Sequence, residues 1–594
     1  MKNSTKITAC IILAFGIAVW GCGLKHTAST ATATGANGLP QDVLQSCTVS
    51  QDTFNHWFAS GKATQNGLVL PANSVTFPHQ NNCDFYQWSE RMFLWLTSPA
   101  TGQYGNGHSI LESAVFYNVS PPDSAGTRTL SPHIPNTPFR MDNHVEKNGP
   151  DRLPVFRDNA GNLFEVETVK QSTKTPILLK NAAGKSVELA QIKTGAAGAL
   201  TFLDKSGQPI VHPQPIIQHR QNHMRIVKRL IIGRTAALLD ASGAPVQTEA
   251  GQATGDVLMD QNKSLVYYLT LVNDVYAYFL TGAKGGKLSG SQFPTTAAAR
   301  DSICAIARAN HVTLPDSNAL AIELKTSWVE ASSLPDPQNY FTINATIPTY
   351  KTTDSLWVPV SEKTVPMALV GVHIVGSVAG HPEMVWSTFE HLKITPNAAY
   401  AYVDVNNKTQ TVPQDTGKNW LFSNNASDSI INKSHMISVN GTDTIAAKKP
   451  YTISPSNTLL TIPWGSAKDS VTNPEDKSSA ASNSEVISMN NTIYKYLVGT
   501  DIRKNYLLIG ATWTSGGAPP NGNSYGSDTT AGVAIGTSVL ANSTMETYFM
   551  SPTHSCFTCH SGSTPTLIPG DISHIYSGLV PLINSYNLRK KNKK

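Results

Sequence analysis

The sequence predicts a mainly β, α+β fold with a hairpin-rich, β-sandwich-like body and a few helices. From about residue 324 to 464, short apolar stretches alternate with turns rich in Gly, Pro, Asn and Ser, which is typical of sheets of short strands. Between about residues 155 and 246, four turns share the pattern Asp/Asn-x-x-Gly, at 158–161, 181–184, 204–207 and 240–243. Asp or Asn opens such a turn through its side chain and glycine closes it, so each turn predicts a β-hairpin.

The composition excludes several other classes of protein. Only 14% of the 594 residues are charged, against an average of about 25%, so the chain is neither a coiled coil nor a disordered polyampholyte. The net charge is +5, and residues 589–594 at the C-terminus alone supply five positive charges. The rest of the chain is therefore neutral, and we expect no nucleic-acid partner, because such binding needs basic residues clustered on a folded face.

The N-terminus has the layout of a bacterial export signal. Lys2 and Lys6 precede an apolar run over residues 7–20, which is too short for a stable membrane span. The run ends in Gly21-Cys22, which resembles a lipoprotein signal whose cysteine is lipidated and becomes the new N-terminus. We therefore expect a signal peptide at 1–21, a lipid anchor on Cys22, a flexible tether at 22–40, and a location in the periplasm or at the outer membrane. Cleavage and secretion without a lipid is the alternative.

The remaining chain divides into four regions by pattern and composition. Region 41–250 holds the hairpins and an aromatic helix, since apolar residues over 85–96 repeat at helical spacing. Cys47 and Cys83 in this region are assigned by elimination to a structural disulfide, because free thiols are the exception in an exported chain. Region 251–464 is expected to form helices at about 264–281 and 295–309, followed by the β-sandwich-like part. Polar residues 465–484 predict a loop or linker, and region 485–594 begins with a helix and a strand over 485–513.

The C-terminal region carries the most specific motif. Cys556-Phe557-Thr558-Cys559-His560 has the C-x-x-C-H form that marks covalent attachment of a c-type heme. Two thiols on one helical turn can each add to a vinyl group of the same porphyrin, and the adjacent imidazole then lies under the iron as its proximal ligand. We therefore expect one heme c per chain, bound through Cys556, Cys559 and His560. A redox dithiol, a structural disulfide and half of a zinc site are the alternatives.

The motif resembles the heme-binding motif of cytochromes c. Three further blocks look like those of large exported bacterial proteins called cytochrome c family proteins: 372–391 (VHIVGSVAGHPEMVWSTFEH), 506–514 (YLLIGATWT) and 540–548 (LANSTMETY). The resemblance implies heme and redox chemistry without a settled substrate. Small class I cytochromes carry a methionine ligand well downstream of the motif, whereas no Met follows His560 here. We therefore expect the heme to pack against the large upstream domain.

The second axial position of such a heme must be filled from elsewhere or left open. His574 is the nearest downstream candidate as a distal ligand. Met550 and His554 lie upstream, after a short helix that we expect to start at the capping-box pair Ser543 and Glu546. An open position would favour O₂ or peroxide chemistry over electron transfer.

A second group of polar residues lies on a predicted strand–turn–strand unit. Three imidazoles and two carboxylates fall within 19 residues: His373, His381, Glu383, Glu390 and His391. Such a cluster could furnish a distal heme ligand, a proton relay or a metal site. Ordinary solvated or hydrogen-bonded core roles are the alternative for several of them.

Three functions fit these residues. We expect first a c-type heme protein of the cell envelope that transfers electrons to or from a redox partner protein, whose acidic surface the basic C-terminal tail could dock. The second is a heme-dependent oxygenase or peroxidase with an open distal site. The third is a heme-free surface binding module in which C-x-x-C is a structural disulfide.

Overall fold

The computed structural model describes most of the chain beyond the N-terminal leader. The described residues are 34–122, 127–143, 153, 155–158, 163–171, 176–194, 200–217, 225–232, 235–246, 248–249, 256–316, 318–426, 430–439, 443–448, 450–465, 479–521, 531–547, 556–560 and 569–582. The expected signal peptide and lipid anchor at Cys22 lie outside them, as do Met550, His554 and the basic tail.

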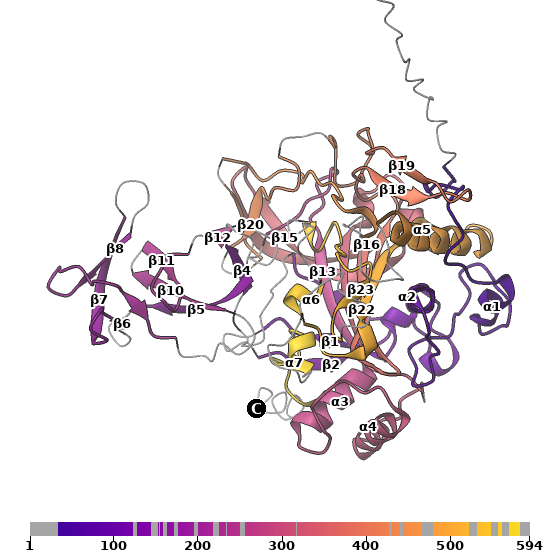
Figure 1. Ribbon diagram of the computed structural model, residues 1–594, viewed down its shortest axis with the longest axis horizontal. Coiled ribbons are helices and arrows are strands. Elements are labelled where there is room, and N and C mark those ends of the chain that lie inside the picture. The colour runs from indigo at the N-terminus through magenta and orange to yellow at the C-terminus, as the bar shows by residue number, and fades with distance from the viewer. Residues whose placement is uncertain are drawn as a thin grey trace, which may run out of the picture.

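The prediction of a mainly β, α+β fold is confirmed, and one large sheet forms the body (Figure 1). Its strands are bonded in the order β2 (Leu130–Pro132), β1 (Phe116–Val119), β13 (Tyr267–Asn273), β14 (Ile322–Glu330), β16 (Leu356–Val378), β17 (His381–His391), β22 (Tyr506–Thr514) and β23 (Ala534–Gly536). The sheet also includes β3 (Phe139–Arg140), β15 (Thr342–Thr352), β20 (Met436–Ser438) and β21 (Ile445–Ala447). Among the described strand pairs of this sheet only β3 with β15 is parallel. The sheet joins strands from the predicted sandwich-like region, such as β15, β16 and β17, with strands from earlier and later parts of the chain.

Helices cover both faces of the large sheet. One face packs against α1 (Gln51–His56), α2 (Asn82–Leu96) and α5 (Ser479–Tyr496). The other packs against α3 (Asp274–Lys284), α4 (Ala297–Ala309) and the C-terminal α7 (Pro569–Ile572), while α6 (Cys556–Cys559) lies close to α7 (Figure 1). Neighbouring residues of β16 divide between these two cores, because successive side chains of a strand point to opposite faces: Ile374 joins the first and Val375 the second.

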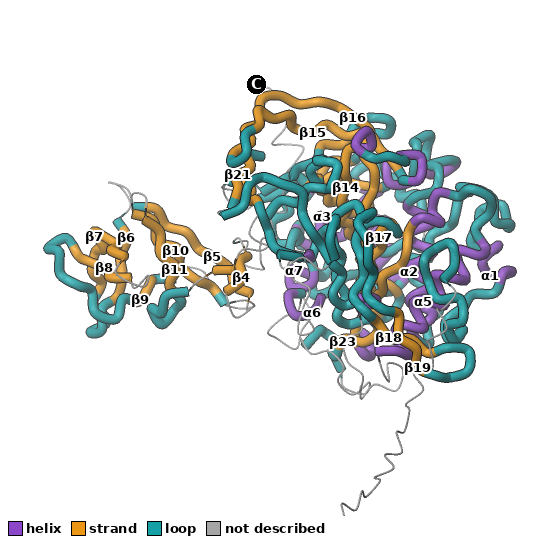
Figure 2. Tube along the Cα trace, turned by 90° about the horizontal axis from the view of Figure 1, so that it is seen from above, coloured by secondary structure: helices purple, strands orange, loops and turns teal. Residues whose placement is uncertain are grey.

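Two smaller sheets project from the body as a separate lobe, which Figures 1 and 2 both show. One sheet contains, in bonding order, β11 (Thr235–Leu239), β10 (Ile226–Ile232), β5 (Leu163–Lys170), β4 (Val155–Asp158) and β12 (Thr248–Glu249). The other contains β8 (Leu200–Asp204), β7 (Ser186–Thr194), β6 (Ile177–Lys180) and β9 (Gln214–Pro215).

A further hairpin on the body pairs β18 (Tyr400–Val403) with β19 (Thr409–Val412). Short 3₁₀ helices lie at Gly102–Tyr104, Ile110–Glu112, Ala331–Ser333, Pro337–Asn339, Pro463–Gly465, Ile502–Asn505 and Ser515–Gly517.

Three of the four predicted hairpin turns are confirmed. Asn181, Asp204 and Asp240 each accept two backbone N–H bonds on Oδ1, from the residues two and four positions later. The glycine that closes each turn has a positive φ, 72° at Gly184 and 76° at Gly207. The turn at 158–161 lies partly outside the described residues.

Two predicted helices are wrong in part. Of the helix expected at 264–281, the first half is strand β13, because its aromatic and β-branched residues pair with β1 and β14 on both sides, and only α3 is helical. Where the helix was expected to start at Ser543, the described residues up to 547 form a turn instead. Asn542 accepts the Thr544 N–H at 3.0 Å, and the Glu546 carboxylate accepts the Asn542 N–H at 3.0 Å. The predicted helices at 85–96 and 295–309 are confirmed as α2 and α4. The pair at 485–513 is confirmed as α5 and β22, with α5 beginning at Ser479 within the expected polar linker.

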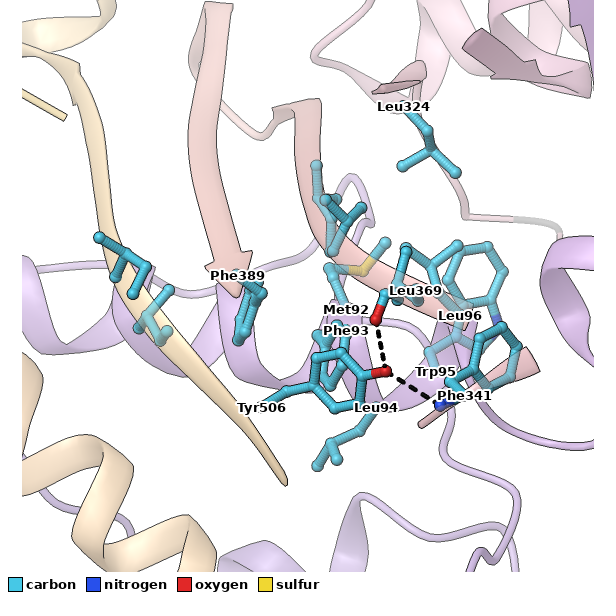
Figure 3. Close-up of a cluster of buried hydrophobic side chains, with 14 of the residues drawn as sticks. Met92, Phe93, Leu94, Trp95, Leu96, Leu324, Phe341, Leu369, Phe389 and Tyr506 are labelled. Atoms are coloured by element: carbon cyan, nitrogen blue, oxygen red, sulfur yellow. Dashed lines mark hydrogen bonds between the residues drawn. The ribbon is translucent and has the colours of Figure 1, made fainter. Parts of the chain in front are cut away.

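The aromatic stripe of α2 forms the centre of the first core (Figure 3). The ring of Phe93 stacks on that of Phe389 in β17, with centroids 4.5 Å apart. The hydroxyl of Tyr506 in β22 donates to the Leu369 carbonyl at 3.0 Å and accepts the Phe341 N–H at 2.9 Å. Near the start of α2, Cys47 and Cys83 lie at disulfide distance, with 5.3 Å between their Cα atoms.

We expect Tyr506→Phe to lower the free energy of unfolding by about 1–3 kcal/mol, because it leaves a buried N–H and a buried carbonyl without their shared partner. Urea denaturation measures the change. Tyr494→Phe is the matched control, since no hydrogen bond to its hydroxyl is found within the described residues. Equal stability of the two variants would contradict this role for the Tyr506 hydroxyl.

Candidate functional site

Alternate residues on one face of β17 hold the C-terminal part of the chain. Trp386 contacts the rings of Phe557 and His560, with centroids 5.9 and 4.3 Å away. Thr388 accepts a bond from the Asn542 amide at 2.9 Å. Glu390 accepts two bonds from Ser543, one from the backbone N–H and one from the hydroxyl. Because these three residues alternate along the strand, they present one continuous surface to the C-terminal chain.

The C-x-x-C part of the motif forms a single helical turn. Helix α6 spans Cys556 to Cys559, and the His560 N–H donates to the Cys556 carbonyl at 3.0 Å. Phe557 is fully buried and packs edge-on against Trp386. The turn therefore has both cysteines on one helical turn, as heme attachment requires, and it is anchored by the residue between them.

His560 has the tautomer that a metal ligand needs. Its Nδ1 lies 2.7 Å from the carbonyl oxygen of Ile572 at the end of α7. Since a carbonyl only accepts, Nδ1 carries the proton and the lone pair lies on Nε2. Metal-binding histidines commonly make this second hydrogen bond, which fixes the ring and raises its basicity. The described part of the motif thus fits a c-type heme with His560 as its proximal ligand.

His574 contacts the proximal candidate directly. Its ring stacks on that of His560, with centroids 4.1 Å apart and planes at 15°. A porphyrin cannot lie between two rings that are already in contact, so His574 would have to move to become a ligand on the opposite face. Both rings are half-buried.

Residues 569–582 contact the body at several points. The Ser573 hydroxyl donates to the Glu323 carboxylate at 2.5 Å and lies 2.7 Å from the Tyr276 hydroxyl. Lys284 at the end of α3 donates to three carbonyls of the segment: those of Tyr576, Ser577 and Leu579. A parallel bridge joins Arg128 to Leu579. These contacts fix α7 and, through the Ile572 carbonyl, the orientation of His560.

Two carboxyl groups under the C-terminal chain titrate near neutral pH. Burial raises the pKa of Glu323 to about 7, against the opposing effects of the Ser573 hydrogen bond and of Arg128 and Lys325. Burial likewise raises the pKa of Glu390 to about 7, against its two bonds from Ser543. Each group therefore exchanges a proton in the physiological range.

The polar cluster predicted at 373–391 divides among three places. His373 bonds the Glu546 carboxylate at 2.8 Å, on the face that carries the C-terminal chain. There it lies diagonally across from Trp386, because His373 pairs with Thr388 and Val375 pairs with Trp386. Glu390 occupies the same face. Both residues therefore share with Trp386 the face that carries the C-terminal chain, and they contact residues 543 and 546 rather than the motif itself.

The other three members of the cluster lie away from the motif. His391 stacks on Tyr340 at 3.8 Å, and burial lowers its pKa to about 3, so it is a neutral core residue. His381 lies at the far end of β17 and bonds Glu383 at 2.8 Å. Glu383 is fully buried and also accepts the Thr514 N–H at 3.1 Å. A single site built from all five residues is therefore wrong.

Sequence reasoning missed the residues that position His560. Trp386 lies 174 residues before His560 in the chain, and Glu323 lies still earlier. Ile572 is close in sequence but acts through its backbone carbonyl, which leaves no signal in the sequence. Within the described residues no group of three or more His, Cys, Asp or Glu side chains converges on a metal position.

No protein-family model, curated protein or solved structure matches the chain. The resemblance to cytochrome c family proteins therefore depends on the motif and blocks of the sequence. Across the described part of the chain, no helix combines the length and the apolar character needed to cross a bilayer.

We expect Glu323→Gln to flatten the pH dependence of stability. Because burial raises the pKa of Glu323 from 4.5 to about 7, the folded state keeps a proton that the unfolded state releases. This contribution to stability is present below pH 4.5 and is lost as the pH rises to 7, by up to about 3 kcal/mol. Urea denaturation from pH 4.5 to 8 should show this decline in the wild type and in the exposed control Asp52→Asn. Parallel curves for Glu323→Gln and wild type would contradict it.

Proposed function

We propose that the chain is a c-type heme protein of the cell envelope that transfers electrons through one heme attached to Cys556 and Cys559. The observation that carries the proposal is the bond from His560 Nδ1 to the Ile572 carbonyl, because it presents Nε2 as the iron-binding atom. A bound heme would supply one-electron chemistry at a potential set by its ligands and surroundings. The family resemblance stated above supports the same conclusion.

The chain's own residues have three roles in this proposal. The thiols of Cys556 and Cys559 hold the porphyrin edge, and their shared helical turn keeps them at matching spacing. His560 is held in one orientation by Ile572 on one side and by the Trp386 ring on the other. Buried Phe557 fills the space between the turn and the sheet and excludes water there.

The proposal extends to the place of the protein in the cell. Cys22 carries the lipid that anchors the protein, in the periplasm or at the outer membrane, and residues 22–40 act as a tether. A redox partner protein with an acidic surface docks the basic residues 589–594 through weak, salt-sensitive contacts.

A heme-dependent oxygenase or peroxidase is the second candidate, and one observation favours it. His574 packs on the His560 ring instead of facing it across a gap, so the nearest downstream imidazole is not placed as a sixth ligand. If neither His574, Met550, His554 nor a histidine of the polar cluster binds the iron, the distal position is open to O₂ or peroxide.

We expect heme to stay on the denatured wild-type protein when it is made in a host that matures cytochromes c. The double variant Cys556→Ala/Cys559→Ala should lose it, because both thioether bonds are gone. Heme staining after denaturing electrophoresis measures this. Cys304→Ala is the control. This variant should keep the stain, because Cys304 lies on α4 and outside the motif. A wild type without stain would overturn the heme proposal.

Added cyanide or azide separates electron transfer from an enzymatic role. If a side chain fills the sixth position, the absorption spectrum of the oxidised protein should change slowly and only at high ligand concentration. If the change appears in the wild type only slowly but in His574→Ala rapidly, His574 is the ligand. Rapid, tight binding in the wild type would favour the oxygenase or peroxidase.

Cys22→Ser tests the anchor. We expect the wild type to partition into detergent and the variant to remain in the aqueous phase, because a lipid chain supplies the membrane affinity. Equal partitioning of both proteins would mean that export occurs without lipidation.

A further inference from the structure

A pair of histidines lies on the opposite face of β17 from the C-x-x-C-H motif. His381 starts the strand, and His79 lies in the loop before α2. Their ring centroids are 4.7 Å apart, and the ring planes meet at 71°. His381 is nearly buried and His79 is half-buried, so the pair sits at the edge of the first core.

In both histidines the Nδ1 atom makes the hydrogen bond that orients the ring. His381 donates its Nδ1–H to the Glu383 carboxylate at 2.8 Å, and His79 donates its Nδ1–H to the Phe77 carbonyl at 3.2 Å. Each ring therefore has its lone pair on Nε2, and no hydrogen bond to either Nε2 is found within the described residues. A carboxylate or carbonyl behind each imidazole is the arrangement that orients histidines bound to metals.

The spacing of the rings also fits one shared ion. With metal–nitrogen bonds of about 2.0 Å, two imidazoles on one ion place their ring centres roughly 4.5–5 Å apart. The separation of 4.7 Å between His79 and His381 falls within this range, whereas the rings of His560 and His574 stack nearly parallel with centroids 4.1 Å apart.

The surroundings favour a bound cation. The carboxylates of Glu383 and Asp84 lie close enough to His79 to interact with it electrostatically. One oxygen of fully buried Glu383, Oε2, has no hydrogen-bond partner within the described residues, so the negative charge here is only partly compensated.

We propose that His79 and His381 bind one divalent transition-metal ion through their Nε2 atoms, with Cu²⁺ bound most tightly. Imidazole nitrogens suit Cu, Zn and Ni, and Cu²⁺ has the highest affinity in that series. Water completes the coordination, because the described residues bring no third side chain of the usual ligand types to the ion. The site does not depend on the heme proposal.

The backbone links this metal site to the C-x-x-C-H side of the sheet. The Trp386 indole N–H donates to the Glu383 carbonyl at 3.0 Å, and the Trp386 ring contacts His560. Between them Met384 has a φ of 69°, a strained conformation for a residue other than glycine. The same short segment therefore positions a ligand-holding carboxylate on one face and the neighbour of His560 on the other.

The test is titration of the purified full-length protein with Cu²⁺, followed by calorimetry and electron paramagnetic resonance. We expect one tight site whose spectrum shows two nitrogen ligands, with affinity at least about tenfold lower in His79→Ala and in His381→Ala. His56→Ala is the matched control and should bind as the wild type does. Exposed His56 also bonds a carbonyl through Nδ1, but no other imidazole contacts it among the residues that the structure describes.

Folding of the variants is checked separately. His79 is more exposed than His381, so His79→Ala is the variant that decides the question if His381→Ala does not fold. Zn²⁺ should also raise the melting temperature of the wild type and not that of His79→Ala, because a ligand that binds only the folded state stabilises it. Unchanged Cu²⁺ affinity in folded His79→Ala, or loss of affinity in only one of two folded variants, would overturn the proposal.

Discussion

The hydrogen bond from His560 to the Ile572 carbonyl ties the C-x-x-C-H turn to the folded body. Helix α6 is a single turn, and a helix this short has no stability of its own in water. Its orientation therefore comes from contacts with distant parts of the chain: the Trp386 ring, the buried Phe557 side chain and the α7 carbonyl. Ser573 carries this restraint further, to Glu323 in β14.

Strand β17 organises two chemically different faces. Trp386, Thr388 and Glu390 face the C-terminal chain. On the other face His381 contacts His79 in the loop before α2 and bonds Glu383. Alternation along a strand explains why five polar residues that are close in sequence do not form one site. It also explains how a redox centre and a metal ion could lie a few residues apart without sharing a ligand.

Local signals predicted the parts of the fold that depend on local chemistry. The Asp/Asn-x-x-Gly turns were predictable because the Asp or Asn side chain itself forms the hydrogen bonds of the turn. Helix α2 was predictable because its apolar residues repeat at helical spacing within one short segment. Strand β13 was not, because its residues suit helix or strand and only pairing with β1 and β14 decides. The C-x-x-C-H motif was visible in the sequence, but the partners of His560 were not, since Trp386 lies 174 residues away and Ile572 acts through its backbone.

We propose that this folded body presents one heme, attached at the C-x-x-C-H turn, with His560 as its proximal ligand. The most direct measurement is mass spectrometry of the proteolytic fragment that contains residues 556–560, taken from denatured protein made in a host that matures cytochromes c. We expect a fragment that is heavier by one heme and whose two cysteines are unavailable to alkylation. A fragment of unmodified mass whose cysteines form a disulfide, or react with an alkylating reagent, would contradict it.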